Sequence, residues 1–238
     1  VLSGKSYPKT GGHLTIESGE GLATSSGHIH VRTANAGTAG ISGMLVFSSG
    51  TSTSGNSGAI SVGSGTATGG RGGALTLTVG EGNSGTGGIM RMYAGDSSAA
   101  TGGAMYIESG HSSLSSSGLI QIRTANAGTS GRSGLLSFSS GSTTKGNSGS
   151  LFIGSGDAAV GRGGSITLTV GNGDSGNGGS INVIAGRTSD SATGGHLEIA
   201  SGESSATSSG DLHIYTANAG TAGISGMLVF SSGTSTSG

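Results

Sequence analysis

Apolar residues recur in pairs along this chain, two residues apart and at a fixed distance after a glycine. That glycine stands at 12, 27, 43, 58, 73, 88, 103, 118, 134, 149, 164, 179, 195, 210 and 226, so every step is 15 or 16 residues. With this glycine as position 0 of a repeat, positions +2 and +4 are apolar in all fifteen repeats, position +6 is Ser, Thr, Val or Ala, and position +7 is Gly in twelve and Ala in three. Apolar residues at a period of two are typical of a strand with one buried face. We expect the strand to end at +6 and the glycine at +7 to supply a turn with positive φ.

The repeat is shorter than a β-propeller blade or a leucine-rich repeat, and glycine at this density destabilises helices. The pattern therefore predicts an all-β fold: a thin, flattened β-solenoid (β-helix) with 15–16-residue rungs, about fifteen of them, stacked ~4.8 Å apart. One wall would carry the aliphatic side chains and the other mainly Gly, Ala, Ser and Thr. We expect the backbone ladder between rungs to supply much of the stability.

A longer period is superimposed on the first. HLTIESG (13–19), AMYIESG (104–110) and HLEIASG (196–202) match, which gives a super-repeat of six rungs, or 91–92 residues, and Thr33–Gly55 is identical to Thr216–Gly238. We expect one continuous β-solenoid over 1–238, with super-repeats at about 11–101, 102–193 and an incomplete 194–238. Val1–Gly4 aligns with positions +4 to +7 of a preceding rung, and the last rung stops at +12. The chain is therefore expected to be a stretch of a longer array, since solenoids normally carry caps.

Composition narrows the possible functions. The 238 residues include 54 Gly and no Cys, with 3% aromatic and 9% charged residues and a net charge of −1. There is no thiolate site or disulfide framework, and no basic stripe that would favour nucleic acid. No apolar run is long enough to predict membrane insertion in this segment.

Positions +1, +3 and +5 would face outward and stack from rung to rung. Oppositely charged or titratable residues occupy the same outward position in adjacent rungs: Glu17 with Arg32, Glu108 with Arg123, Glu198 with His213, and His196 with Asp211. Such stacked pairs contribute roughly 0.2–1 kcal/mol each. We interpret them as structural pairs rather than a catalytic acid and base, since no pocket is implied and the third super-repeat has Ala200 and Tyr215 in place of the Glu and Arg.

Two other patterns bear on ligands. The sets His13, His28 and His30, and His196, Asp211 and His213, would gather on one face, where imidazoles could hold Zn²⁺ or Cu²⁺. The middle super-repeat has Ala104, Leu119 and Gln121 instead, which favours solvated histidines. GNGDSGNGG (171–179) resembles Gly/Asp-rich turns that bind Ca²⁺, but the matching GEGNSGTGG (80–88) lies six rungs away. We therefore predict no catalytic, cofactor-binding or metal-binding residues, no cofactor, and no enzyme.

Outward Thr and apolar residues suggest two kinds of interaction surface, one for ice and one for other copies of the chain. Thr76/Thr78 and Thr167/Thr169 form pairs that occur on one rung in six, whereas an ice-binding array needs them on consecutive rungs. Outward apolar residues recur chiefly on the third and sixth rungs, which suits lateral packing with like rods: Met44, Val46, Ile89, Tyr93, Leu119, Leu135, Phe152, Ile184, Met227 and Val229. The Ser/Thr-rich turns could carry O-glycans.

The sequence TANAGT occurs three times, at 33–38, 124–129 and 216–221, each time in a 16-residue rung. Ala replaces the usual glycine at +7, and the following Asn tolerates the left-handed conformation. We expect the motif to move the turn one residue later and to absorb the extra residue as a bulge.

The rhythm of SSGHIHVRT, GNSGAISVGSG and GGSITLTVGNGDSGNGG covers nearly the whole chain. It resembles Gly/Ser-rich tandem-repeat β-solenoid cell-surface and fibre proteins of diatoms, oomycetes and related algae, and in style the shafts of microbial adhesins. The resemblance implies an extracellular or cell-surface filament, shaft or appendage and transfers no functional residue. We expect a structural protein that self-assembles by end-to-end or long-array growth. The alternative is an adhesive rod that binds glycan, mineral or ice through outward Ser, Thr and His ladders.

Overall fold

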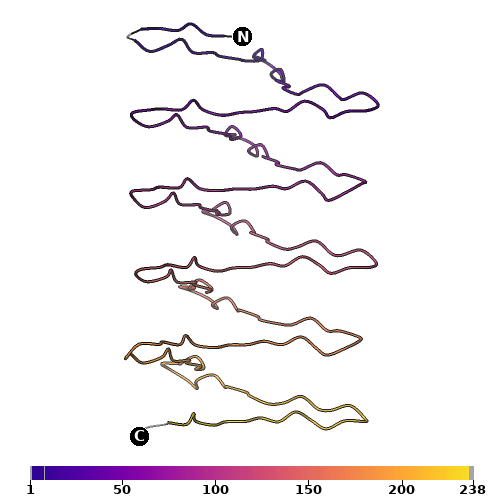
Figure 1. Cartoon of the computed structure of the whole chain (residues 1–238), viewed down its shortest axis with the longest axis vertical. Coiled ribbons are helices and arrows are strands. Elements are labelled where there is room, and N and C mark those ends of the chain that lie inside the picture. The colour runs from indigo at the N-terminus through magenta and orange to yellow at the C-terminus, as the bar shows by residue number, and fades with distance from the viewer. Residues whose placement is uncertain (1, 8, 236–238) are drawn as a thin grey trace. The chain divides into compact units, whose positions relative to one another are not determined.

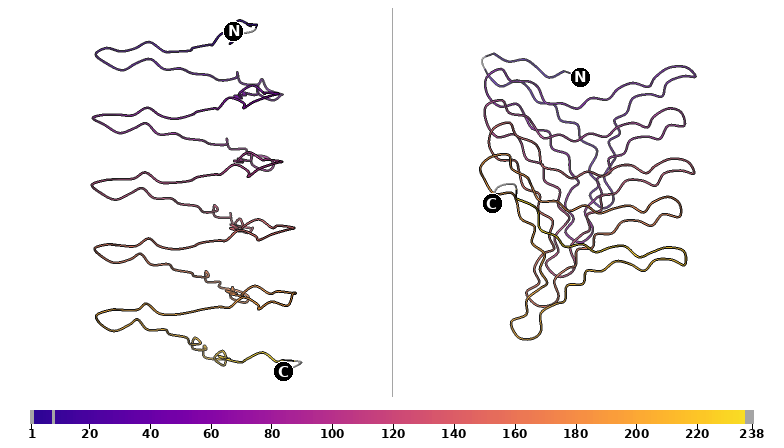
Figure 2. Two further views of the ribbon diagram at one scale, coloured as in Figure 1. Left: turned by 90° about the vertical axis from the view of Figure 1, so that its left-hand side faces the viewer. Right: turned by 60° about the horizontal axis from the view of Figure 1, so that its bottom comes forward.

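The predicted β-solenoid is wrong. The computed structural model describes residues 2–7 and 9–235, and in these residues it has no helix and no β-strand. The chain separates into two units, Val1–Ile120 and Gln121–Gly238, and the boundary falls within the second predicted super-repeat. Figure 1 shows each unit as a continuous trace that reverses direction repeatedly, without a single arrow or coil, and the views in Figure 2 agree.

The missing core explains why rungs do not stack into a sheet. No hydrophobic residue is buried among the described residues. The alternation survives only in part, as a difference in exposure at +2: Leu136 is 46% exposed and its outward neighbour Leu135 is 89% exposed. At +4 the difference can be reversed, since Phe47 is 71% exposed and its outward neighbour Val46 is 63% exposed. The wall predicted to face the aliphatic side chains consists of Gly, Ser, Thr and Ala, which offer little apolar area to bury. The conformational entropy lost on ordering so many glycines costs more free energy than this small apolar contact contributes.

Each repeat nevertheless reverses direction at a defined place. In the 15-residue repeats the chain bends at +10 to +12, for example at 22–24, 53–55 and 113–115. Beyond this bend the chain returns to the next position-0 glycine. An ideal Cβ on that glycine would lie between 2.5 Å (Gly88, Gly179) and 3.7 Å (Gly210) from the +6 side chain of the preceding repeat, and all fifteen glycines face that side chain. The invariant glycine therefore marks a close approach of two chain segments.

Hydrogen bonds close some of these reversals. The amide of the position-0 glycine donates to the carbonyl of the +7 glycine at six junctions, at 2.8–3.0 Å: Gly12 to Gly4, Gly27 to Gly19, Gly103 to Gly95, Gly118 to Gly110, Gly195 to Gly186 and Gly210 to Gly202. At other junctions a +6 hydroxyl contributes, as where Thr33 Oγ1 donates to the carbonyl of Gly43 at 3.0 Å and Ser155 Oγ to that of Gly164 at 2.9 Å. These contacts are local, between segments about ten residues apart.

The bends use two kinds of turn chemistry. Some have a glycine with positive φ near their end: Gly40, Gly55, Gly85, Gly131, Gly146, Gly161 and Gly176. Others use a hydroxyl that accepts a backbone N–H, as Ser97 does from Ala100 at 2.9 Å, Ser112 from Ser115 at 3.0 Å and Ser204 from Thr207 at 3.0 Å. Such Ser-based turns satisfy a donor that the reversal would otherwise leave free. The expectation that the +7 glycines have positive φ is wrong, because the positive φ lies at the bend instead.

The TANAGT prediction is half right. The three repeats that contain the motif bend at 38–40, 129–131 and 221–223, which is +11 to +13 and so one residue later than in the 15-residue repeats. Among the described residues no Asn, nor any other non-glycine residue, has positive φ. The displaced bend is completed by Gly40 (φ 142°) in one copy and Gly131 (φ 143°) in the next. No strand is present there to carry a bulge.

The six-repeat period is visible in these local conformations. The φ values of Gly85 and Gly176, 91 residues apart, are 79° and 76°. The glycine-to-glycine hydrogen bonds recur at the same two junctions of each super-repeat. Similar sequence therefore gives similar local geometry in both units. Val1 and residues 236–238, which the predicted end rungs include, lie outside the described residues.

Candidate functional site

In the extended run from +1 to +5, the side chains at +1, +3 and +5 lie on one side of the chain. In two of these runs they bring potential metal-binding groups together. In the run that follows Gly27, the rings of His28 and His30 lie with centroids 6.0 Å apart and planes inclined by 50°. In the equivalent run after Gly210, His213 Nε2 lies 3.9 Å from Asp211 Oδ2, and both side chains are exposed. Both pairs arise within one run, from positions +1 and +3.

The predicted pairs between adjacent rungs are not formed. Asp211 with His213 is the sole close pair of an acidic and a basic side chain in residues 2–7 and 9–235, so Glu17 with Arg32, Glu108 with Arg123, Glu198 with His213 and His196 with Asp211 stay apart. The reason is that stacked pairs need neighbouring runs in register, and the runs form no sheet. Sequence analysis placed His28 with His30, and Asp211 with His213, within larger sets on one face, and the structure brings together only these two pairs within a run.

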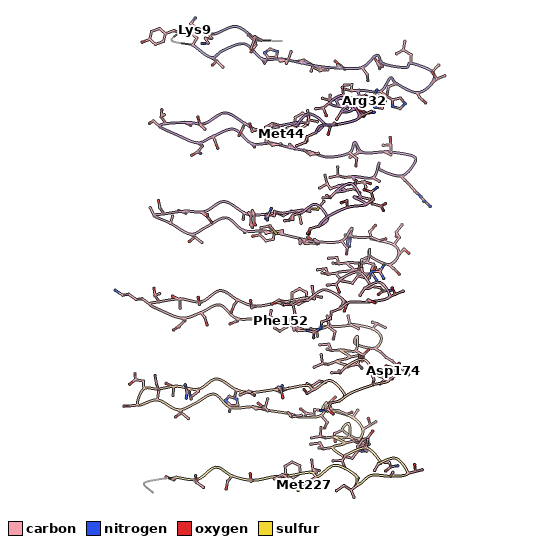
Figure 3. The ribbon with its side chains drawn as sticks, turned by 45° about the vertical axis from the view of Figure 1, so that its right-hand side comes forward. Lys9, Arg32, Met44, Phe152, Asp174 and Met227 are labelled. Carbon is pink, nitrogen blue, oxygen red and sulfur yellow. The ribbon has the colours of Figure 1, made fainter. Side chains whose placement is uncertain are left out.

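The larger ligand sets do not assemble either. No group of three or more His, Cys, Asp or Glu side chains close enough to share a metal ion occurs in the described part of the chain. His13 therefore does not join His28 and His30, and His196 does not join Asp211 and His213. The Ca²⁺-like turn at 171–179 holds Asp174 on an exposed loop (Figure 3), away from any carboxylate cluster.

Sequence analysis missed a hollow at the start of two of the three TANAGT motifs, those at 33–38 and 124–129. Arg32, Thr33, Ala34 and Asn35 line a space of about 330 Å³. The equivalent Arg123, Thr124, Ala125 and Asn126 line one of about 320 Å³. His30 and Arg32 border a further hollow of about 290 Å³. The sequence feature that marks these hollows is the arginine directly before TAN in the first two copies of the motif. The third copy has Tyr215 at that position.

The large apolar side chains of the described residues are exposed to different degrees. The outward Met44, Phe152 and Met227, labelled in Figure 3, are 85%, 90% and 84% exposed. At positions +2 and +4 the side chains are shielded more, but none is buried among the described residues. Lateral packing through the outward residues stays a prediction.

Two further findings concern the chain as a whole. Among the described residues there is no helix of the length and apolarity needed to cross a membrane. No protein-family model, curated protein or solved structure matches the chain.

Proposed function

We propose that this chain is a structural protein that self-associates into an extracellular filament, shaft or appendage. One observation carries the proposal: 31% of the residues are hydrophobic, yet none is buried in the described part of the chain. Exposed apolar surface beyond a few hundred Å² marks an interaction surface. A chain with this much of it is stabilised by burying it against another molecule.

The partner that fits this surface is a second copy of the same chain. Each repeat presents two apolar side chains, at +2 and +4, with the same spacing in every repeat. Two copies therefore offer matching rows of side chains, and any shift by one repeat restores the match. A net charge of −1 over 238 residues leaves little electrostatic repulsion to oppose association. Fifteen weak contacts along one chain act together, as in other multivalent binding.

The extracellular, cell-surface assignment is part of the same proposal. It is supported by the resemblance in rhythm to Gly/Ser-rich tandem-repeat proteins of cell surfaces. A mechanical role depends on repetition rather than on a single site, and fifteen similar repeats make up this chain.

The experiment uses the purified chain across a range of concentrations, with light scattering for association and electron microscopy for filaments. The test variant replaces +2 and +4 with Ser in the third repeat of each super-repeat, at Leu45, Phe47, Leu136, Phe138, Leu228 and Phe230. The control variant changes the outward neighbours in the same repeats, Met44, Val46, Leu135, Met227 and Val229, to Ser.

We expect the test variant to raise the concentration needed for association at least about tenfold, since each tenfold corresponds to about 1.4 kcal/mol and each buried large side chain contributes about 1.5–3 kcal/mol. The control variant removes outward residues that lateral packing would use, so it measures that contribution, and we expect it to change the association concentration less than the test variant does. A wild-type chain that stays monomeric at every concentration overturns the proposal. Association that is lost only in the control variant would overturn the role of +2 and +4.

A further inference from the structure

Two imidazoles stand beside each other on one extended run. His28 and His30 occupy +1 and +3, with Ile29 between them, and their ring centroids are 6.0 Å apart. Both side chains are exposed. Neither is required by the self-association proposed above, which rests on +2 and +4.

This spacing suits one metal ion held by both rings. A Zn–N distance of about 2.0–2.1 Å puts the ion roughly 3 Å from each ring centre, so two rings that share an ion have centres roughly 5–6.5 Å apart, depending on the angle between the bonds. The observed 6.0 Å lies inside this range. Only side-chain rotation is needed to aim a nitrogen of each ring at a common point, because both χ angles of an exposed His are free.

We propose that His28 and His30 form a two-imidazole chelate for a borderline divalent cation of the first transition row, with Cu²⁺ bound most tightly. Imidazole is a preferred ligand for Cu²⁺, Ni²⁺ and Zn²⁺, and affinity at a nitrogen site peaks at Cu²⁺. Water completes the coordination, since no third ligand-type side chain joins the pair in the described residues. The site is consequently open and of modest affinity.

The other super-repeats supply natural comparisons. In the third, Asp211 and His213 occupy the same two positions, with Nε2 and Oδ2 3.9 Å apart. One carboxylate oxygen and one imidazole form a weaker site for the same ions. In the second, Leu119 and Gln121 stand at these positions and offer no imidazole. Arg32 borders a hollow with His30, and its charge opposes a cation there.

The test titrates Cu²⁺ into the full chain, with calorimetry for affinity and NMR for location. His28→Ala and His30→Ala should each weaken the tightest Cu²⁺ binding by at least about tenfold. Each variant leaves one imidazole, so the second ligand, which the chain holds at a high effective concentration, is lost. His13→Ala and His111→Ala are the matched controls and should leave it unchanged. Removing the charge with Arg32→Gln should tighten binding.

NMR and pH give independent readouts. Paramagnetic Cu²⁺ should broaden the signals of residues around 28–30 first and those around 211–213 at higher ion concentration. Acidification should release the ion, because imidazole coordinates a metal ion only when it is neutral. Equal broadening at all six histidines, or unchanged affinity in His28→Ala and His30→Ala, overturns the proposal.

Discussion

Replacing Gly103 with Ala tests whether the position-0 glycine is required for the chain reversal. In the structure its amide donates to the carbonyl of Gly95 at 2.8 Å. A Cβ added to Gly103 would lie 3.1 Å from Gly95 N, 3.3 Å from Gly95 O and 3.5 Å from the Cβ of Ala94. The nearest atoms belong to backbone and cannot rotate away, so the two segments must separate by a few tenths of an ångström.

The size of the effect follows from that separation. Inserting a carbon into a close contact costs about 1–3 kcal/mol, and the hydrogen bond that closes the loop contributes about 0.5–1.5 kcal/mol. The free-energy cost of the crowding is therefore at least as large as the free energy that the hydrogen bond contributes. At about 1.4 kcal/mol per tenfold change, the closed reversal should become roughly 5–10 times less populated or more.

The neighbouring Gly102 is a matched control. A Cβ there would meet only Gly95 O, at 3.6 Å, which is ordinary contact. Both variants make the same Gly→Ala change in the same loop, so they share the effect on the unfolded chain. Only Gly103→Ala should accelerate amide hydrogen exchange at 103 and weaken the nuclear Overhauser effect between the Ala94 methyl and residue 103. If both variants behave alike, the close approach does not explain the invariant glycine.

Two further changes test local chemistry. Ser112→Ala removes the hydroxyl that accepts a 3.0 Å hydrogen bond from the Ser115 amide. Amide hydrogen exchange at 115 should accelerate several-fold, as expected for a loss of about 1 kcal/mol, and the control Ser113→Ala should leave it unchanged. Equal exchange rates in both variants would contradict the turn assignment. Asn172 precedes Gly173 in an exposed loop, and glycine has no side chain to hinder its backbone nitrogen. That nitrogen can attack the side-chain carbonyl carbon of Asn172 and expel ammonia, and water then opens the resulting succinimide at either carbonyl. On ageing, mass spectrometry should find conversion to aspartate and isoaspartate there before it does at Asn182, which precedes a branched Val; equal rates would contradict this.

Local features were predictable from the sequence because they depend on a few neighbouring residues. The 15-residue spacing predicted that every repeat reverses direction, but the turn expected at +7 lies at +10 to +12 instead. The extra residue in the TANAGT repeats predicted a turn one position later, and their bend lies at 38–40 rather than 37–39. Gly40 and Gly131, which are 91 residues apart, have φ values that differ by one degree. Each outcome needs only backbone sterics and a nearby hydroxyl or glycine.

The sheet could not be predicted from the same pattern. Apolar residues at +2 and +4 define one face of a run, but a sheet also needs a second surface to cover that face. Leu45 and Phe47 show the problem: they are 49% and 71% exposed because only small residues are available to oppose them. Likewise, equal outward positions in adjacent repeats, such as those of Glu17 and Arg32, become neighbours only if the runs align. The pairs that do form, His28 with His30 and Asp211 with His213, lie within one run and need no alignment.

This division between local and long-range order bears on how the chain could work. A reversal held by a glycine contact and one hydrogen bond needs no core, so repeats can be added or removed without loss of a fold. The cost is that every aliphatic pair remains open to solvent, and stability beyond the single loop has to come from other molecules. In the self-association that we propose, a second copy would supply the same pairs at the same interval, and its contacts would accumulate with every repeat added. The strength of association would then rise with the length of the chain, which is the behaviour that a structural polymer requires.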